Sequence, residues 1–231
     1  MLNVIYEDNH ILVVIKPQNI PTQADISGDT CMVELVENYL REKYNKPGNI
    51  YVGLVHRLDR PTGGLMIFAK TSKAAGRLSE AIKTEDFEKK YLAVVNGVVK
   101  EPTGTLVNYL KKNSRTNLVT VVPQLTEGAK YARLTYKVLE TKEKVSLVSV
   151  ALDTGRSHQI RVQFKHIGHP IYGDVRYGGD ILAKGHNLAL WAYKLKFVHP
   201  VTKKKMTFMS MPNEDMVPWK SFNINNLLLN D

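Results

Sequence analysis

The sequence predicts an α+β domain built around a mixed, largely antiparallel sheet with flanking helices. Three observations lead to this prediction. Short apolar runs typical of strands are the commonest pattern, only a few stretches have the apolar spacing of a helix, and the two patterns do not alternate regularly. Regular alternation would predict a doubly wound parallel sheet, so its absence favours an α+β arrangement.

The first part of the chain contains two predicted helices among three predicted strands. The apolar run at 11–16 is closed by Pro17, which is typical of a strand end. Both helices open at a polar residue and repeat their apolar residues on one face. We predict strands at Ile11–Lys16, Tyr51–Val55 and Leu65–Lys70, and helices at Asp29–Lys43 and Thr71–Lys83.

The remainder of the chain is richer in strands. Asn96-Gly97 lies between two valine-rich runs and predicts a hairpin turn. A helix is expected from Ser157, with Ile160, Phe164 and Ile167 on its buried face. The end of the chain, 223–231, is expected to be a tail or a short helix. The predicted strands are Lys90–Val95, Thr105–Leu110, Leu118–Val122, Tyr131–Glu140, Val145–Leu152, and a final pair, Leu188–Val198 and Met206–Met211, joined by a turn containing His199-Pro200.

Composition limits the function classes. The 231 residues form no run of eighteen apolar residues, show no basic leader and contain one cysteine, Cys31, so we expect a cytoplasmic protein without a membrane span or a disulfide. The histidines are scattered and no CxxC pair is present, which argues against a metal site. Thirty-two Lys and Arg against twenty-two Asp and Glu give a net charge of +10, which favours a nucleic-acid partner over a merely solubilising surface.

The densest chemical motif is His-Arg-Leu-Asp-Arg-Pro-Thr-Gly-Gly at 56–64. In an extended chain Arg57 and Asp59 project to the same side, so the guanidinium favours the ionised carboxylate. Gly63 and Gly64 allow either a tight turn or a close approach of other atoms. An anchored carboxylate flanked by Arg57 and Arg60 suits attack on a sugar carbon beside a phosphate chain. The alternative is a structural Arg–Asp pair at a strand end.

Two further stretches could contact RNA. In Thr-Gly-Arg-Ser-His-Gln-Ile-Arg at 154–161, a turn opens onto a helix whose N–H groups, with Arg156 and His158, could hold a phosphate. A solvated helix cap is the alternative. At 89–91, Tyr91 follows two lysines, including Lys90, and could stack on a base, although a half-buried sheet tyrosine is more usual. The turn-rich stretch 168–174 is expected to be structural.

Taken together and in this order, these stretches resemble the RluA-type pseudouridine synthases over nearly the whole chain. The similarity includes Lys16-Pro17, His-Arg-Leu-Asp at 56–59 with Thr62 and Gly64-Leu65, and Lys90-Tyr91-x-Ala93. It continues with Thr-Gly-Arg-x-His-Gln-Ile-Arg at 154–161 and Gly-His-Pro-Ile-x-Gly-Asp at 168–174. The family usually has Ser or Thr where Gly63 stands, a change that removes no catalytic group.

The resemblance implies a function and roles for individual residues. It implies an isomerase that converts specific uridines of ribosomal or transfer RNA into pseudouridine after flipping the target base, without cofactor or metal. Asp59 matches the essential aspartate, Tyr91 the tyrosine that packs against the base, and Arg161 the arginine that pairs with the aspartate. Arg57 matches a residue that contacts RNA, and we expect RNA contacts from Arg60, Arg156, His158 and Lys90.

The resemblance leaves several points open. Asp59 could add to C1′ of the ribose or abstract a sugar proton to give a glycal. We expect a monomer with one catalytic domain over 1–231 and no accessory RNA-binding domain ahead of it, because Lys16-Pro17 comes early in the chain. Two alternatives are a non-catalytic RNA-binding protein with this fold and a glycoside or nucleoside hydrolase, in which Asp153 or Asp174 would supply the second acid.

Overall fold

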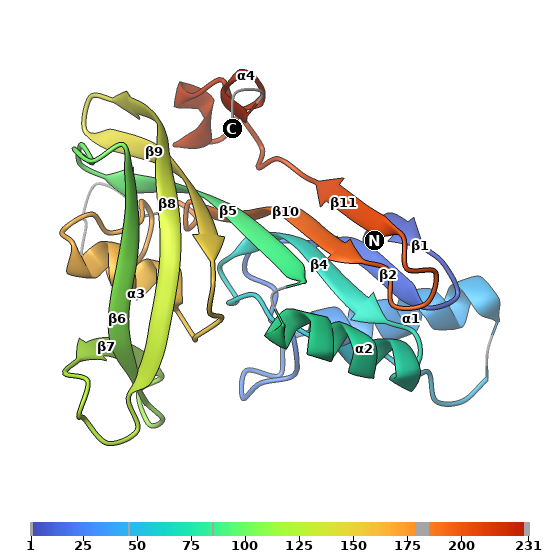
Figure 1. Ribbon diagram of the computed structural model, residues 1–231. Coiled ribbons are helices and arrows are strands. Elements are labelled where there is room, and N and C mark those ends of the chain that lie inside the picture. Colours follow the sequence, from blue (N-terminus) through green and yellow to red (C-terminus); the bar gives the residue numbers. More distant parts are fainter. Residues whose placement is uncertain (1, 46, 85, 179–184, 229–231) are drawn as a thin grey trace. The chain divides into compact units, whose positions relative to one another are not determined.

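The computed structural model describes the whole chain except residues 1, 46, 85, 179–184 and 229–231 (Figure 1). The chain folds into two compact units. Unit 1 comprises Met1–Lys89 and Ala192–Ser210, and unit 2 comprises Lys90–Trp191 and Met211–Asp231. Two strands, β5 and β10, contain a boundary between the units, so neither unit is one continuous segment of sequence. None of the helices in the described part of the chain is long and apolar enough to cross a membrane.

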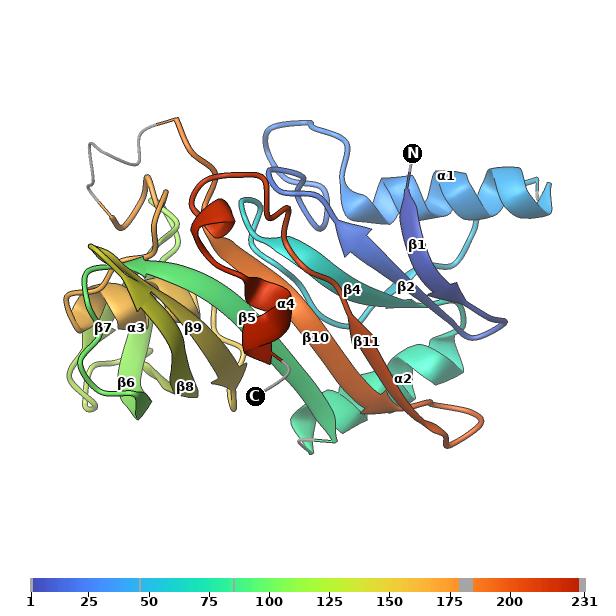
Figure 2. The ribbon, with the colours of Figure 1, turned by 90° about the horizontal axis from the view of Figure 1, so that it is seen from above.

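Unit 1 is a sheet with a helix on each face. The strands follow the order β1-β2-β4-β10, with β3 paired to β4 and β11 paired to β10. Helices α1 and α2 lie on opposite faces of β2 and β4, as Figures 1 and 2 both show. The bounds are β1 Asn3–Glu7, β2 Ile11–Lys16, α1 Met32–Tyr44, β3 Gly53–Leu54, β4 Gly63–Ala69, α2 Ser72–Lys83, β10 Leu190–Val198 and β11 Lys205–Met209.

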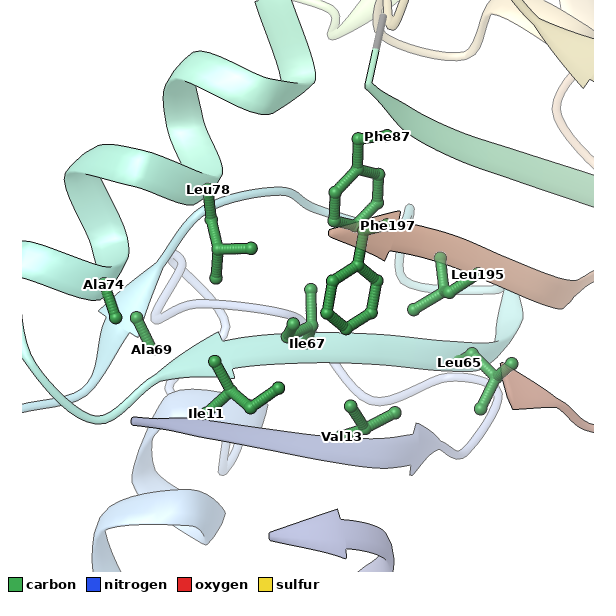
Figure 3. Close-up of a cluster of buried hydrophobic side chains, with 10 residues drawn as sticks. All are labelled: Ile11, Val13, Leu65, Ile67, Ala69, Ala74, Leu78, Phe87, Leu195 and Phe197. Carbon is green, nitrogen blue, oxygen red and sulfur yellow. The ribbon is translucent and has the colours of Figure 1, made fainter. Parts of the chain in front are cut away.

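The core of unit 1 explains why the sequences of β2 and β4 are nearly continuous runs of apolar residues. Their alternate side chains pack beneath α2 together with aromatic residues, and Phe87 stacks on Phe197 with ring centroids 5.4 Å apart (Figure 3). The residues between them are equally buried and point to the opposite face. Because both faces of these strands are covered, every residue of β2 and β4 is apolar or glycine except Lys16 at the end of β2. The cluster consists of Ile11, Val13, Leu65, Ile67, Ala69, Ala74, Leu78, Phe87, Leu195 and Phe197.

Unit 2 is an antiparallel sheet with one helix packed across part of it. The strand order is β5-β9-β8-β6-β7, and each neighbouring pair is antiparallel. Helix α3 packs against β6, β7 and β8 through a cluster of Leu110, Val119, Ala132, Val162 and Tyr177. The bounds are β5 Phe87–Asn96, β6 Thr103–Asn113, β7 Leu118–Val122, β8 Lys130–Lys142, β9 Val145–Leu152, α3 Gln159–His166, the 3-10 turn Trp219–Ser221 and α4 Ile224–Leu228.

The predicted fold class is confirmed, and most elements lie where the sequence places them. The strands β7 and β9 match their predicted ranges, and α2 begins after its predicted cap, Thr71, whose Oγ1 accepts the Ala74 N–H at 3.2 Å. The turn at His199-Pro200 joins β10 to β11 as expected. The predicted strand at 51–55 is reduced to two residues. Of the last stretch, 224–228 is helical and 229–231 lie outside the described residues.

Two predicted helices begin later than the sequence suggests. Helix α1 starts at Met32 rather than Asp29, because the N–H groups of Met32 and Val33 bond to the carbonyls of Pro21 and Thr22. Helix α3 starts at Gln159 rather than Ser157, because His158 has a left-handed backbone with φ 54°. Hydrogen bonds to a distant segment thus set the start of α1, and the backbone conformation of His158 sets the start of α3.

The hairpin predicted at Asn96-Gly97 is wrong. Strand β5 has β9 and β10 as neighbours, whereas β6 lies between β8 and β7. Gly97 does adopt the left-handed backbone of a turn, with φ 85°, but its N–H donates to the carbonyl of Lys144 at 2.6 Å. This bond continues the β5–β9 pairing, and the Asn96 N–H bonds to Pro170 on the other edge, so no edge of β5 is left at this turn for a hairpin strand.

Candidate active site

Asp59 lies in unit 1, in the loop that joins β3 to β4. The residue before it, Leu58, is buried, and both its backbone groups bond to the hydroxyl of Thr22. On the other side the carbonyl of Asp59 accepts the Thr62 N–H at 3.0 Å. The loop is thus fixed on both sides of the half-buried Asp59 side chain.

The alternation expected in this loop is present. Arg57 is exposed and Leu58 is buried. His56 packs inward as well, where its Nε2 accepts the Ile67 N–H at 3.1 Å. Burial and the nearby Lys89 charge lower the pKa of His56 to about 3, so the ring is neutral and serves as a structural acceptor. The motif therefore directs Arg57 to solvent and uses His56 and Leu58 as anchors.

Gly64 lies inside β4, where the close approach of other atoms rather than a tight turn requires glycine. Its φ is 117°, and a Cβ atom there would lie 2.3 Å from the carbonyl oxygen of Ala192 in β10. Only glycine permits this contact without moving the backbone. Gly63 and Gly64 thus bring β4 against β10 directly after the Asp59 loop.

Arg60 is held by acidic residues of a neighbouring loop. Its guanidinium bonds to Asp25 at 2.9 Å, to Asp29, and to the hydroxyl of Ser27 at 2.6 Å. Hydrogen bonds from Ser27 and Arg60 lower the pKa of Asp25 to about 2. The contact of Arg60 with RNA stays a prediction, and in the structure this side chain ties the Asp59 loop to residues 25–29.

Lys16 is a site residue for which the sequence suggested no role. Its side chain is fully buried, and Nζ donates to the carbonyls of Pro17 at 2.8 Å and Arg60 at 2.9 Å. Burial lowers its pKa to about 7; the charge of Asp59 acts against this shift and that of Arg60 adds to it. Lys16 therefore binds a backbone carbonyl of the Asp59 loop and interacts electrostatically with the candidate catalytic carboxylate.

The lowered pKa of Lys16 predicts a pH-dependent stability. Between about pH 7 and 10.5 the unfolded chain carries a proton on Lys16 that the folded chain lacks, so the free energy of unfolding rises with pH. Lys16→Met removes this titration. We expect the stability difference between wild type and variant to shift in favour of wild type by up to ~3 kcal/mol from pH 7 to 9.5, measured by urea unfolding. A pH-independent difference would contradict the assignment, and Lys73→Met, at an exposed site on α2, controls for loss of a lysine.

The other predicted catalytic residues lie in unit 2. Tyr91 is in β5, where it is buried and pairs in register with Val150 of β9. Arg161 is in α3 and forms a two-point ion pair with Asp174, with Nε–Oδ2 and Nη2–Oδ1 distances of 2.7 Å each. Both side chains of this pair are buried. Because Asp174 binds the Nε–Nη2 edge, it fixes the plane in which the rest of the guanidinium is presented.

Asp174 is the partner of Arg161, a role that the sequence does not indicate. The stretch 168–174 was expected to be only a structural loop. Asp174 also accepts the N–H groups of Arg176 and Tyr177, at 3.1 Å each, so the loop holds the carboxylate in place. The Tyr177 ring lies 5.0 Å from the Arg161 guanidinium carbon. No spacing or periodicity in the sequence indicates this role, because only the fold brings Asp174 to the Arg161 side chain of α3.

Most polar groups at the start of α3 form hydrogen bonds within the protein. The Gln159 side chain accepts the Arg156 N–H at 3.0 Å and the Thr154 hydroxyl at 2.8 Å. Arg156 Nε donates to the carbonyl of Tyr131 at 2.9 Å. His158 Nδ1 lies 2.7 Å from the hydroxyl of Tyr177, which also accepts the Val119 N–H. The phosphate contact expected at this helix start stays a prediction, as do RNA contacts by Arg156, His158 and Lys90.

Comparison with known proteins identifies a family. The model of the family described as RNA pseudouridylate synthase matches residues 10–166. Ribosomal large subunit pseudouridine synthase D of Vibrio cholerae is 32% identical over 94% of this chain and 69% of that protein. Synthase C of Buchnera aphidicola is 35% identical over 88% of this chain and 65% of that protein. The chain thus spans about two thirds of the length of these relatives.

Solved structures support the fold. The chain named Human RNA Pseudouridylate Synthase Domain Containing 4 superposes with a TM-score of 0.76 at 21% identity, covering 91% of this chain and 89% of that one. The chain named Human RNA Pseudouridylate Synthase Domain Containing 1 gives 0.75 at 24% identity, covering 100% and 94%. The predicted α+β architecture therefore has counterparts among solved synthase domains.

Proposed function

The chain belongs to the RNA pseudouridylate synthase family, whose members are isomerases that act on RNA, and we propose that it converts uridine into pseudouridine with Asp59 as catalytic carboxylate. One observation carries the assignment of Asp59. Its side chain is half-buried in a loop whose neighbouring backbone groups are fixed by Thr22 and Thr62, and the segment lies within the family match. An acidic side chain held in this way can act at one defined atom of a flipped nucleotide.

The reaction requires one bond to be exchanged for another. The N1–C1′ bond of uridine breaks, the uracil turns, C5 joins C1′ and loses its proton, and N1 takes up a proton from water. We propose that the Asp59 carboxylate acts at the ribose, by adding to C1′ and later leaving or by taking a sugar proton and later returning it. Either route consumes no oxidant, reductant or group donor, because substrate and product are isomers.

Two residues of unit 2 complete the proposal. From the resemblance to the family, we assign Arg161 to keep Asp59 in its anionic form. Tyr91 would pack against the uracil and assist removal of the C5 proton. We further propose that the two units act as a single catalytic domain, which is supported by the family match running through residues of both.

The hydrolase alternative has weaker support. It needs a second carboxyl group that is available as an acid. Of its two candidates, Asp174 is buried and bound to Arg161, and Asp153 pairs with Arg133 at 3.1 Å. The alternative of a non-catalytic RNA-binding protein does not explain why the loop that carries Asp59 is held in one position.

The substrate we propose is ribosomal RNA, because the names of two similar relatives specify the large ribosomal subunit. Such a substrate is consistent with the predicted cytoplasmic location. Pseudouridine mapping of total RNA from cells with and without the gene tests the proposal. We expect a pseudouridine in large-subunit RNA to disappear when the gene is removed. Loss of pseudouridine only from transfer RNA would refute the ribosomal assignment. An unchanged map would refute both the ribosomal assignment and the proposed synthase activity.

A further inference from the structure

We propose that the open face of strands β6, β7 and β8 in unit 2 is a second RNA-contact surface, which binds a part of the substrate away from the target nucleotide. The inference rests on the proposed function, because it assumes an RNA substrate. We call this surface the ribbon face. It consists of Val107, Tyr109, Lys111, Leu118, Thr120, Tyr131 and Arg133.

The strand register separates the ribbon face from the core. In β6 every second side chain, such as Leu110, points to the face that packs beneath α3 with Val119 and Ala132. The side chains between them point the opposite way. There Tyr109 pairs with Tyr131, Val107 with Arg133 and Lys111 with Thr120. One face of this part of the sheet is therefore core and the other is open.

The aromatic residues of the ribbon face are suited to bases. The rings of Tyr109 and Tyr131 lie directly across the β6–β8 pair with centroids 5.8 Å apart, nearly perpendicular to each other. Tyr131 is 41% exposed and its neighbour Val107 is 49% exposed. Exposed aromatic rings on a sheet provide stacking positions for unpaired bases, and they tolerate any base sequence.

The charge of this segment favours RNA over other partners. Residues 103–142 contain seven Lys and Arg against two Glu, a net charge of +5. These 40 of 231 residues thus carry half of the net charge of +10. Two of the cations, Lys111 and Arg133, lie on the ribbon face, and Arg156 reaches the Tyr131 carbonyl from the loop before α3. Arg133 also pairs with Asp153 at 3.1 Å. Two copies of so basic a segment would repel each other, whereas phosphates would be attracted.

The test compares RNA binding by ribbon-face variants with that of a matched control. We expect Tyr131→Ala to raise the Kd for a folded large-subunit RNA fragment about tenfold, the loss of one stacked base, with kcat at saturating RNA unchanged. We expect the double variant K111Q/R133Q to reduce the slope of log Kd against log salt by about 2. The control K73Q/K204Q removes two exposed lysines of unit 1 and should reduce that slope less.

The outcomes separate this inference from the proposed function. If Tyr131→Ala and K111Q/R133Q both bind RNA with the wild-type Kd and salt slope, the ribbon face is not an RNA surface. If they instead abolish self-association in sedimentation while RNA binding is unchanged, it is a contact between copies and the inference is wrong. If the wild type binds RNA through this face but forms no pseudouridine, the proposed function fails and the ribbon face stands. If Tyr131→Ala does not fold, the salt slope of K111Q/R133Q still tests whether the ribbon face binds RNA.

Discussion

Asp59→Asn is expected to reduce pseudouridine formation at least about a thousandfold while the protein still binds RNA. The substitution keeps the size and hydrogen-bonding shape of the side chain but removes the charge that acts at the ribose. The backbone bonds that fix the loop, from Thr22 to Leu58 and from Thr62 to Asp59, do not involve this carboxylate. Loss of activity should therefore come without loss of folding, measured by tritium release from uracil C5 alongside an RNA-binding titration.

Asp86→Asn is the matched control for this experiment. It makes the same chemical change at an exposed position of unit 1, and we expect wild-type activity from it. An Asp59→Asn enzyme with activity close to that of the control would show that another group performs the chemistry. A variant that neither reacts nor binds RNA would leave Asp59 with a binding role and would equally contradict the proposal.

Asp174→Asn is expected to lower the free energy of unfolding by about 3 kcal/mol, because it leaves the buried Arg161 guanidinium without its bound carboxylate. Asparagine can still accept one hydrogen bond, but it cannot provide the paired oxygens or the charge. We also expect a lower kcat under conditions where the variant is folded, because the orientation of Arg161 is no longer fixed. Urea unfolding and tritium release at saturating RNA measure the two effects.

The control for Asp174 is Asp153→Asn. Asp153 pairs with Arg133 through side chains that are 30% and 47% exposed, so the same substitution should cost no more than about 1 kcal/mol. If the two variants are equally stable, the buried pair is not the anchor of Arg161. If Asp174→Asn is less stable but keeps full kcat when folded, its role is structural only.

Much of the fold could be read from the sequence because its signals are local. The apolar runs of β2, β7 and β9 and the capped pattern of α2 are properties of a few neighbouring residues. The wrong predictions occur where hydrogen bonds to backbone groups far away in the sequence determine where an element begins or which strands pair. Helix α1 starts where the carbonyls of Pro21 and Thr22 are available, and no hairpin forms at Asn96-Gly97 because β9 and Pro170 already occupy both edges of β5 there.

The same distinction holds for the candidate site. The alternation around Asp59 follows from its own motif, in which Leu58 is buried and Arg57 is exposed, but the Thr22 hydroxyl that anchors Leu58 is 36 residues away. The roles of Lys16 and Asp174 depend on partners 44 and 13 residues away, Arg60 and Arg161. No periodicity or spacing within either segment indicates those partners, so only the folded chain reveals them.

The most direct test of the central claim follows the purified protein acting on large-subunit RNA labelled with tritium at uracil C5. The claim is that the protein isomerises uridine within RNA. It predicts that tritium is released to water while the base stays attached as pseudouridine, and that free uridine does not react. Release of free uracil, or turnover of free uridine, would show hydrolysis and contradict the claim.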